Sequence, residues 1–211
     1  MRKFLIALVI LVVLLVVIDR AGLAIAERQI GTRVQSAYGL PERPGVSVRG
    51  FPFLTQVASG QYQEIDVTIK TASAGGVQLH DIQARFTGVH ASLSLLLGQG
   101  SGSVTAAHAT GTALIPYAQV ERRLPKGITL AAHGSTLQVA GNTPLGAIRT
   151  TVSLGVTKTG ISVSAAALGT RLSYVIPVGQ LPLHLTVTGV HVAAAGLVVS
   201  ATGHNVALTS A

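Results

Sequence analysis

The stretch Ile65-Asp66-Val67-Thr68-Ile69 alternates apolar and polar residues, and this period-two pattern decides the fold. Successive side chains of a β-strand point to opposite faces, so the segment turns one face toward a core and the other toward water. The same alternation recurs in four later segments, at 137–139, 161–165, 183–187 and 190–192. The repetition predicts an antiparallel β-sheet, half-exposed to water, over most of the chain after Pro44.

Glycines interrupt the strand-like runs at Gly60, Gly88, Gly155 and Gly189, and GQGSGS at 98–103 is a turn signal. Glycine inside a strand permits a bend or a bulge, so several of them predict a strongly curved sheet. One short helix is expected in the middle of the chain, from Pro116 to Leu124, with proline at its start and Pro125 closing it.

The chain begins with Arg2 and Lys3 followed by 15 uncharged residues, Phe4 to Ile18. Positive charge before an apolar run leaves the start of the chain in the cytoplasm and sends the rest across the membrane. The run is shorter than the roughly 20 residues that span a bilayer comfortably, although flanking basic side chains can extend it. The alternative is a cleaved signal peptide, because Ala24-Ile25-Ala26 has the form that a signal peptidase accepts.

Both interpretations export the remainder of the chain. We therefore expect residues 1–19 to be a membrane anchor or signal segment and residues 20–211 to be a β-rich ectodomain. The ectodomain would lie in the cell envelope, on the exported side of the plasma membrane, anchored by residues 4–18.

Residues 20–38 are predicted to form a helix that Gly39 and Pro41 end. Its apolar residues recur at spacings of three and four, namely Leu23, Ala26, Ile30, Val34 and Ala37. This stripe either docks onto the sheet of the same chain or lies along the membrane surface. The predicted fold class is therefore α+β, with an N-terminal helix packed on a strongly curved antiparallel sheet and a short helix in mid-chain.

The composition favours lipid chemistry over most alternatives. The 211 residues include no Cys and no Trp, with 15 Lys and Arg against 7 Asp and Glu, and the mean hydropathy is +0.56. The lack of Cys excludes disulfide scaffolds, thiolate zinc sites and cysteine nucleophiles. From Glu27 onward the net charge is still +6, and the sequence remains unusually apolar for an exported domain.

Candidates for catalysis are few. Glu64 and Asp66 share one face of the predicted strand and could act as an acid–base pair, or they could be ordinary charges on an edge strand. No nucleophile elbow, phosphate-binding loop or dinucleotide fingerprint occurs, and the seven His residues lack the spacing of a metal site. We predict no enzymatic activity, no metal and no cofactor.

The segment Val48 to Gln56 carries two Phe residues around a proline and predicts a rigid apolar loop. This loop either packs into the core or forms an aromatic rim at the mouth of an apolar cavity. We therefore consider five residues as candidates for such a cavity or its rim: Phe51, Phe53, Leu54, Tyr62 and Phe86.

Basic residues are too sparse, and aromatic residues too few, for a nucleic-acid surface. The one local cluster is Arg122, Arg123 and Lys126. It would either contact anionic lipid head groups or be the solvated end of a helix. Together with Arg49, these residues are our candidates for head-group contact.

Four features in order resemble the LmeA-like phospholipid-binding proteins of actinobacterial envelopes. The first three are an apolar segment ending in Asp19-Arg20, the motif from Arg49 to Gln56 with Gly60 and Tyr62, and a segment from Leu95 to Gly98 after Gly88-Val89. The fourth is the closing pattern Ile176-Pro177, Leu181-Pro182-Leu183, Val190-His191-Val192 and Gly196 to Gly203. The chain departs from the family between residues 99 and 170, where acidic and aromatic residues are sparse.

The resemblance implies an envelope protein that binds phospholipid and supports maturation of lipoglycans, notably lipomannan elongation. It also implies an antiparallel sheet curved around a helix, with an apolar cavity similar to that of tubular lipid-binding folds. The implied partners are phospholipid, the membrane and enzymes of lipoglycan synthesis. Two alternatives remain open: a scaffolding envelope protein with a filled core, and an enzyme on lipid-linked sugars that uses Glu64 or Asp66.

Overall fold

The computed structural model describes residues 2–74, 76–96, 103–124, 126–143, 146–157, 160–167, 170–177, 183 and 185–208. The turn expected at 98–102 lies outside these residues, as do Leu97, Pro125, Leu181, Pro182 and His184. The chain divides into two compact units. Unit 1 comprises Met1–Thr68, Arg85–Ala109 and His204–Ala211, and unit 2 comprises Ile69–Ala84 and Thr110–Gly203.

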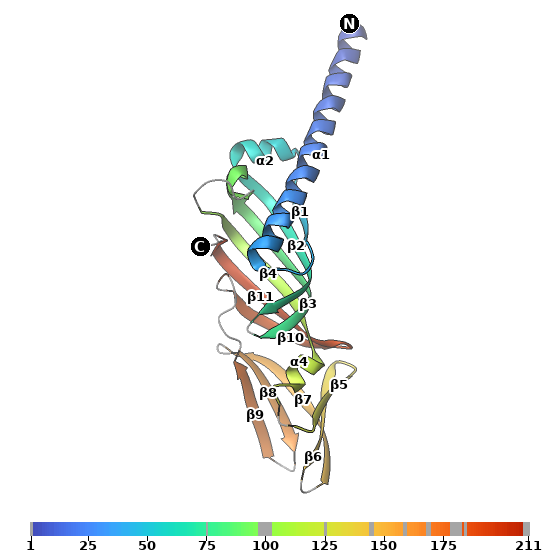
Figure 1. The fold of residues 1–211 in the computed structure, drawn as a ribbon, viewed down its shortest axis with the longest axis vertical. Helices are drawn as coiled ribbons and strands as arrows, with labels where there is room; N and C mark the ends of the chain where they lie inside the picture. The colour runs from blue at the N-terminus through green and yellow to red at the C-terminus, as the bar shows by residue number, and fades with distance from the viewer. Residues whose placement is uncertain are drawn as a thin grey trace. The chain divides into compact units, whose positions relative to one another are not determined.

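Helices and strands follow the order drawn in Figure 1. The helices are α1 (Arg2–Tyr38), α2 (Phe53–Ser59), α3 (Leu93–Leu96) and α4 (Tyr117–Glu121). The first strands are β1 (Gly45–Arg49), β2 (Gln61–Ala74), β3 (Val77–His90), β4 (Thr105–Pro116), β5 (Ile128–His133) and β6 (Thr136–Thr143). The remaining strands are β7 (Gly146–Thr157), β8 (Gly160–Ala167), β9 (Thr170–Pro177), β10 (Thr186–Ala193) and β11 (Gly196–Ala207).

The strands form two sheets, where the alternation had suggested one. The order is β1-β2-β3-β4-β11-β10 in the six-stranded sheet and β5-β6-β7-β8-β9 in the five-stranded sheet. Pairing is antiparallel between β1 and β2, between β10 and β11, and along the whole five-stranded sheet. The α+β class, the N-terminal helix and the antiparallel sheet are thereby confirmed, and the strong curvature stays a prediction.

α1 is one continuous helix that joins the apolar run to the predicted helix 20–38. In Figure 1 its first half projects away from the strands, and its residues Phe4 to Ile18 are all exposed. By length and composition α1 is able to cross a membrane. The second half contacts β1 and buries Ala26 and Ile30, which confirms that the apolar stripe docks on the sheet.

Polar contacts fix the second half of α1 to the sheet edge. β1 is an edge strand, so its outward N–H groups have no partner strand. The carboxylate of Glu27 accepts a hydrogen bond from the Val48 N–H at 2.8 Å and satisfies one of them. Gly31 lets the helix approach closely, because a Cβ at that position would lie 3.0 Å from the carbonyl oxygen of Pro44.

The core of unit 1 lies between helices α1 and α2 and strands β1 to β4. Its buried residues come from every element around it: Ala26, Ile30, Val48, Phe53, Tyr62, Ile65, Val89 and Ala106. The alternation predicted for 65–69 is confirmed, because Ile65 is buried in this core and Glu64 and Asp66 lie on the opposite face of β2.

One face of the five-stranded sheet of unit 2 is mostly aliphatic, and the other is mostly polar. The register places Val152 between Leu137 and Ala165, and Leu154 opposite Val163. Cross-strand neighbours share a face, so one face is aliphatic. The other face is polar and includes Thr136, Gln138, Thr151, Ser153, Ser162 and Ser164. Among the described residues, the buried core here contains Leu137, Val152 and Leu197.

Three local predictions differ from the structure. The loop expected after Pro52 is helix α2, and Gly60 ends this helix in a left-handed conformation with φ +66° instead of bending a strand. The strand expected at 183–187 begins only at Thr186, because Leu183 adopts a positive φ of 65° that an extended strand does not allow. At Gly189 the expected irregularity is confirmed, since the pairing with β11 shifts there.

Candidate functional site

The first polar residue after the apolar run fixes the start of α2. Pro52 precedes this helix and offers no side-chain cap. Instead, the carboxylate of Asp19 on α1 accepts a hydrogen bond from the Leu54 N–H at 2.8 Å. Helix N-termini favour such negative charge, which stabilises a carboxylate that is only 2% exposed. Asp19 therefore ties α2 to the point where α1 enters the folded unit.

The predicted loop divides into exposed and buried residues. Phe51 and Leu54 are 57% and 40% exposed, respectively. The guanidinium of Arg20 lies 4.9 Å from the centroid of the Phe51 ring, within the range of a cation–π contact. Phe53 is buried beside Tyr62, with ring centroids 6.4 Å apart. Phe86 packs against the same core cluster.

The five candidate rim residues thus gather in unit 1 but differ in what they contact. Phe53, Tyr62 and Phe86 belong to the core or border it, whereas Phe51 and Leu54 face outward. Burial raises the pKa of Tyr62, so its phenol stays protonated at neutral pH. The contact of these five residues with lipid stays a prediction.

Three buried polar atoms near this junction lack a hydrogen-bond partner: Asp19 Oδ2, Gln56 Nε2 and Tyr62 OH. Gln56 uses its other atom, Oε1, to accept a hydrogen bond from the Gln63 N–H at 3.0 Å and so links α2 to β2. Asp19 Oδ2 lies 3.8 Å from Arg20 Nε, which gives the buried carboxylate a nearby positive charge.

The acidic pair on β2 belongs to an ion-pair network. Arg49 Nε lies 3.0 Å from Glu64 and 2.7 Å from Asp66. Arg85 Nε on β3 lies 3.4 Å from Glu64 and 2.8 Å from Asp66. The head-group candidate Arg49 is therefore placed against two carboxylates, a neighbourhood that its sequence position alone does not reveal.

This network sets the protonation of Asp66. Burial acts to raise the pKa of Asp66, but the hydrogen bonds and charges of Arg85 and Arg49 outweigh it and hold that pKa below its ordinary value. The hydrogen bond to Asp66 in turn raises the pKa of Arg85. A carboxylate with a lowered pKa is a poor proton donor and a weak base near neutral pH, so Asp66 is ill suited to acid–base catalysis.

The other head-group candidates lie in unit 2. Arg122 caps the C-terminal end of α4, and Arg123 and Lys126 follow it; all three are exposed. Glu121 of the same helix accepts a hydrogen bond from the Leu130 N–H and joins α4 to β5. The structure therefore groups Arg122, Arg123 and Lys126 and assigns Arg49 to the other unit.

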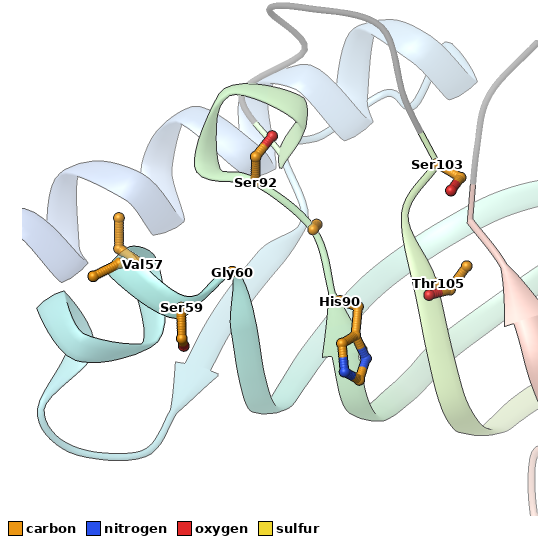
Figure 2. A pocket seen from close by; sticks show the side chains of 9 residues that line it. Val57, Ser59, Gly60, His90, Ser92, Ser103 and Thr105 are labelled. Carbon is orange, nitrogen blue, oxygen red and sulfur yellow. The ribbon is translucent and has the colours of Figure 1, made fainter.

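An open hollow of about 500 Å³ lies in unit 1, and Figure 2 shows it between α2 and the ends of β3 and β4. Its lining is mixed and largely polar: Val57, Ala58, Ser59, Gly60, His90, Ala91, Ser92, Ser103 and Thr105. None of the five candidate rim residues is among them. Its hydroxyl and imidazole groups suit water or a polar ligand better than an acyl chain.

The aliphatic face of the five-stranded sheet is only partly covered. Tyr117 and Val120 of α4 pack on it, together with Val190, Val192 and Leu197 of β10 and β11. Leu154 and Val163 stay half-exposed, and Val156 is 36% exposed on the same face. This partly exposed apolar strip, which consists of Leu154, Val156 and Val163, was not predicted from individual residues, although the alternation along β7 and β8 indicates it.

A histidine pair also escaped the sequence analysis. The Nδ1 atoms of His108 on β4 and His204 on β11 lie 2.8 Å apart, with the rings edge to face. The two residues are distant in sequence, so only the strand pairing reveals them. Within the described part of the chain, no cluster of three or more potential metal ligands occurs.

Comparison with protein families gives one match. A family model described as LmeA-like phospholipid-binding matches residues 17–202, which is most of the chain. The matched range begins two residues before the buried Asp19 and includes both sheets except the last five residues of β11. Neither the curated proteins nor the solved structures yielded a match.

Proposed function

The chain belongs to the LmeA-like phospholipid-binding family, and from this premise we propose that it binds phospholipid with the acyl chains held against the aliphatic face of its five-stranded sheet. The partly exposed strip of that face, Leu154, Val156 and Val163, is the observation that supports this location. Each methylene moved from water onto such a surface contributes about 0.8 kcal/mol, so part of one chain gives useful affinity.

The chemistry of the strip suits a hydrocarbon ligand. Its side chains are branched aliphatics without hydrogen-bonding groups, and charged residues stand on the opposite face, as Arg149 does on β7. The exposed Arg122 and Lys126 belong to the same unit, and we propose that they and Arg123 contact the phosphate of the head group.

The candidate residues of unit 1 divide accordingly. Phe53, Tyr62 and Phe86 hold the core in shape, and Phe51 and Leu54 are the two whose exposed side chains are accessible to a lipid surface. Arg49 would contact a head group only by sharing its charge with Glu64 and Asp66, so we expect its contribution to be the smallest of the four basic candidates.

We further propose that α1 anchors the protein and that the folded units lie on the exported side of the plasma membrane. Arg2 and Lys3 before the apolar run favour this orientation. The role is that of a non-enzymatic binding protein in lipoglycan maturation, acting with enzymes of lipoglycan synthesis. The ion pairs of Glu64 and Asp66 argue against the alternative of an enzyme on lipid-linked sugars.

Native mass spectrometry of the full chain, released from detergent after gentle purification, tests this proposal. We expect a bound species of phospholipid mass, and renewed uptake when the lipid-stripped protein is mixed with labelled phospholipid. The intact mass also reports whether α1 is retained. A chain that emerges without lipid and takes none up would support the scaffolding alternative and overturn phospholipid binding.

A further inference from the structure

The exposure pattern of α1 marks where the apolar run ends. Every residue from Phe4 to Ile18 is exposed, the large hydrophobic ones by 39% to 85%, and the next residue, Asp19, is 2% exposed. The carboxylate of Asp19 is inside the protein and bonded to α2, so it does not limit how deep the junction can sit in lipid. The junction would therefore expose to a membrane the side chains around Asp19, and not the Asp19 carboxylate itself.

The apolar run is too short to span a bilayer by itself. Fifteen helical residues extend about 22 Å at 1.5 Å per residue, against a hydrocarbon core of about 30 Å. The difference must be met by bilayer thinning, by the stems of flanking basic residues, or by apolar protein surface drawn in next to the helix.

The protein surface next to α1 is apolar, so it can be drawn into the bilayer beside the helix. Phe51 and Leu54 expose apolar surface beside the point where α1 enters the folded unit, and Ile18 is 48% exposed just before it. The bond from Leu54 to Asp19 and the contact between Arg20 and Phe51 hold these side chains in place. Arg20 is half-exposed, so its guanidinium can also reach lipid phosphates.

We propose that Phe51 and Leu54 insert into the interfacial region of a phospholipid bilayer and seat unit 1 on the membrane, with Arg20 at the level of the phosphates. This inference rests on the proposed anchoring by α1 and adds a second, independent contact with the bilayer. Its occupant is the bilayer itself, because the apolar surface continues that of the membrane-spanning run. This contact would hold unit 1 on the bilayer, which is the source of the lipid that the protein binds.

Single tryptophans test the seat, because the chain contains none. The full chain carrying Phe51→Trp or Leu54→Trp is reconstituted in vesicles of phosphatidylcholine and phosphatidylglycerol with bromine on the acyl chains. We expect the emission to shift to the blue and to lose most of its intensity by contact with bromine. Val12→Trp within the run serves as the positive control, and Tyr38→Trp, about 39 Å farther along α1, as the negative control.

The outcomes separate the two proposals. If Val12→Trp is quenched while Phe51→Trp and Leu54→Trp behave like Tyr38→Trp, the seat is wrong and the anchor stands. If Val12→Trp also escapes quenching, the anchor and the seat are both wrong. If one equivalent of brominated phospholipid in micelles quenches Phe51→Trp as strongly as the vesicles do, Phe51 touches a bound ligand and the bilayer seat is overturned.

Discussion

The two core clusters differ in what covers their sheets. In unit 1, α1 and α2 lie on the first strands and bury large side chains, Phe53 and Tyr62 among them. In unit 2, the short helix α4 and strands β10 and β11 cover only part of the aliphatic face, and Leu154 and Val163 stay half-exposed. The same alternating pattern thus serves a closed core in one unit and an open apolar surface in the other.

The difference is consistent with a separate role for each unit. A sheet covered by helices is stable without a ligand, whereas apolar surface left in water is a source of free energy for binding an acyl chain. Under the proposed function, unit 1 contributes the anchor and its attachment, and unit 2 offers the surface for lipid.

The largest expected effect comes from opening the closed core. Phe53→Ala should lower the free energy of unfolding by about 3–5 kcal/mol, because Phe53 is 3% exposed and its removal leaves a cavity. Leu154→Ala in unit 2 should cost roughly 1–2 kcal/mol, since its side chain is half-buried. Urea unfolding of the full chain in detergent micelles, followed by circular dichroism, measures both. Equal losses would contradict the distinction between the two cores.

The next effect is on lipid uptake. Val156→Asp places a charge on the aliphatic face, and uptake of labelled phospholipid should fall by about tenfold or more, which corresponds to roughly 1.4 kcal/mol. Val156 is 36% exposed, so the variant should still fold. Ser153→Asp on the opposite face of β7 is the matched control and should bind as the wild type does. Similar uptake by both variants would exclude this face as the binding surface.

The attachment of α2 should be weaker than the core but measurable. Asp19→Ala removes the cap of α2 and should cost about 1–2 kcal/mol of stability. Asp19→Asn keeps an oxygen that can accept the hydrogen bond from the Leu54 N–H, so it should cost less than half as much. Hydrogen exchange of residues 53–59 reports the effect locally. If Asp19→Asn and Asp19→Ala lose the same protection, the carboxylate does not act as a cap.

The smallest effect concerns the ion-pair network. Because the pKa of Asp66 is lowered in the folded state, the stability that the carboxylate contributes is present above its unfolded pKa of about 3.9 and is lost as the pH falls through the lower, folded value. Asp66→Asn should therefore be less stable than the wild type near neutral pH, by up to about 1 kcal/mol for exposed partners. The difference should shrink as the pH falls below about 4 and vanish below the lower, folded pKa, and unfolding curves over this pH range would detect a difference that persists.

Local patterns in the sequence predict the elements that depend on local chemistry. The alternation at 65–69 and 161–165 corresponds to β2 and β8, and the stripe of Ala26 and Ile30 predicts the docked half of α1. Helix α2 was missed because Phe-Leu-Thr-Gln-Val-Ala-Ser is not strongly periodic and its cap comes from Asp19, far away in the chain. Pro52 before it and Gly60 after it were the available signals.

Features that depend on strand pairing could not be predicted. The contacts of Asp66 with Arg85 and of His108 with His204 exist only because particular strands lie side by side. Composition likewise predicts that the loop at 51–54 is apolar, but it does not distinguish the buried Phe53 from the exposed Phe51. That distinction depends on which residues α1 covers.

A phospholipid with a diazirine on its acyl chain can report directly where the chain lies. It is bound to the full-length protein and photolysed, and the labelled peptides are identified by mass spectrometry. We predict labelling of β7 and β8 at Leu154, Val156 and Val163, in addition to the membrane-spanning residues of α1. Labelling confined to α1 and unit 1, with none on the five-stranded sheet, would contradict the proposed binding surface.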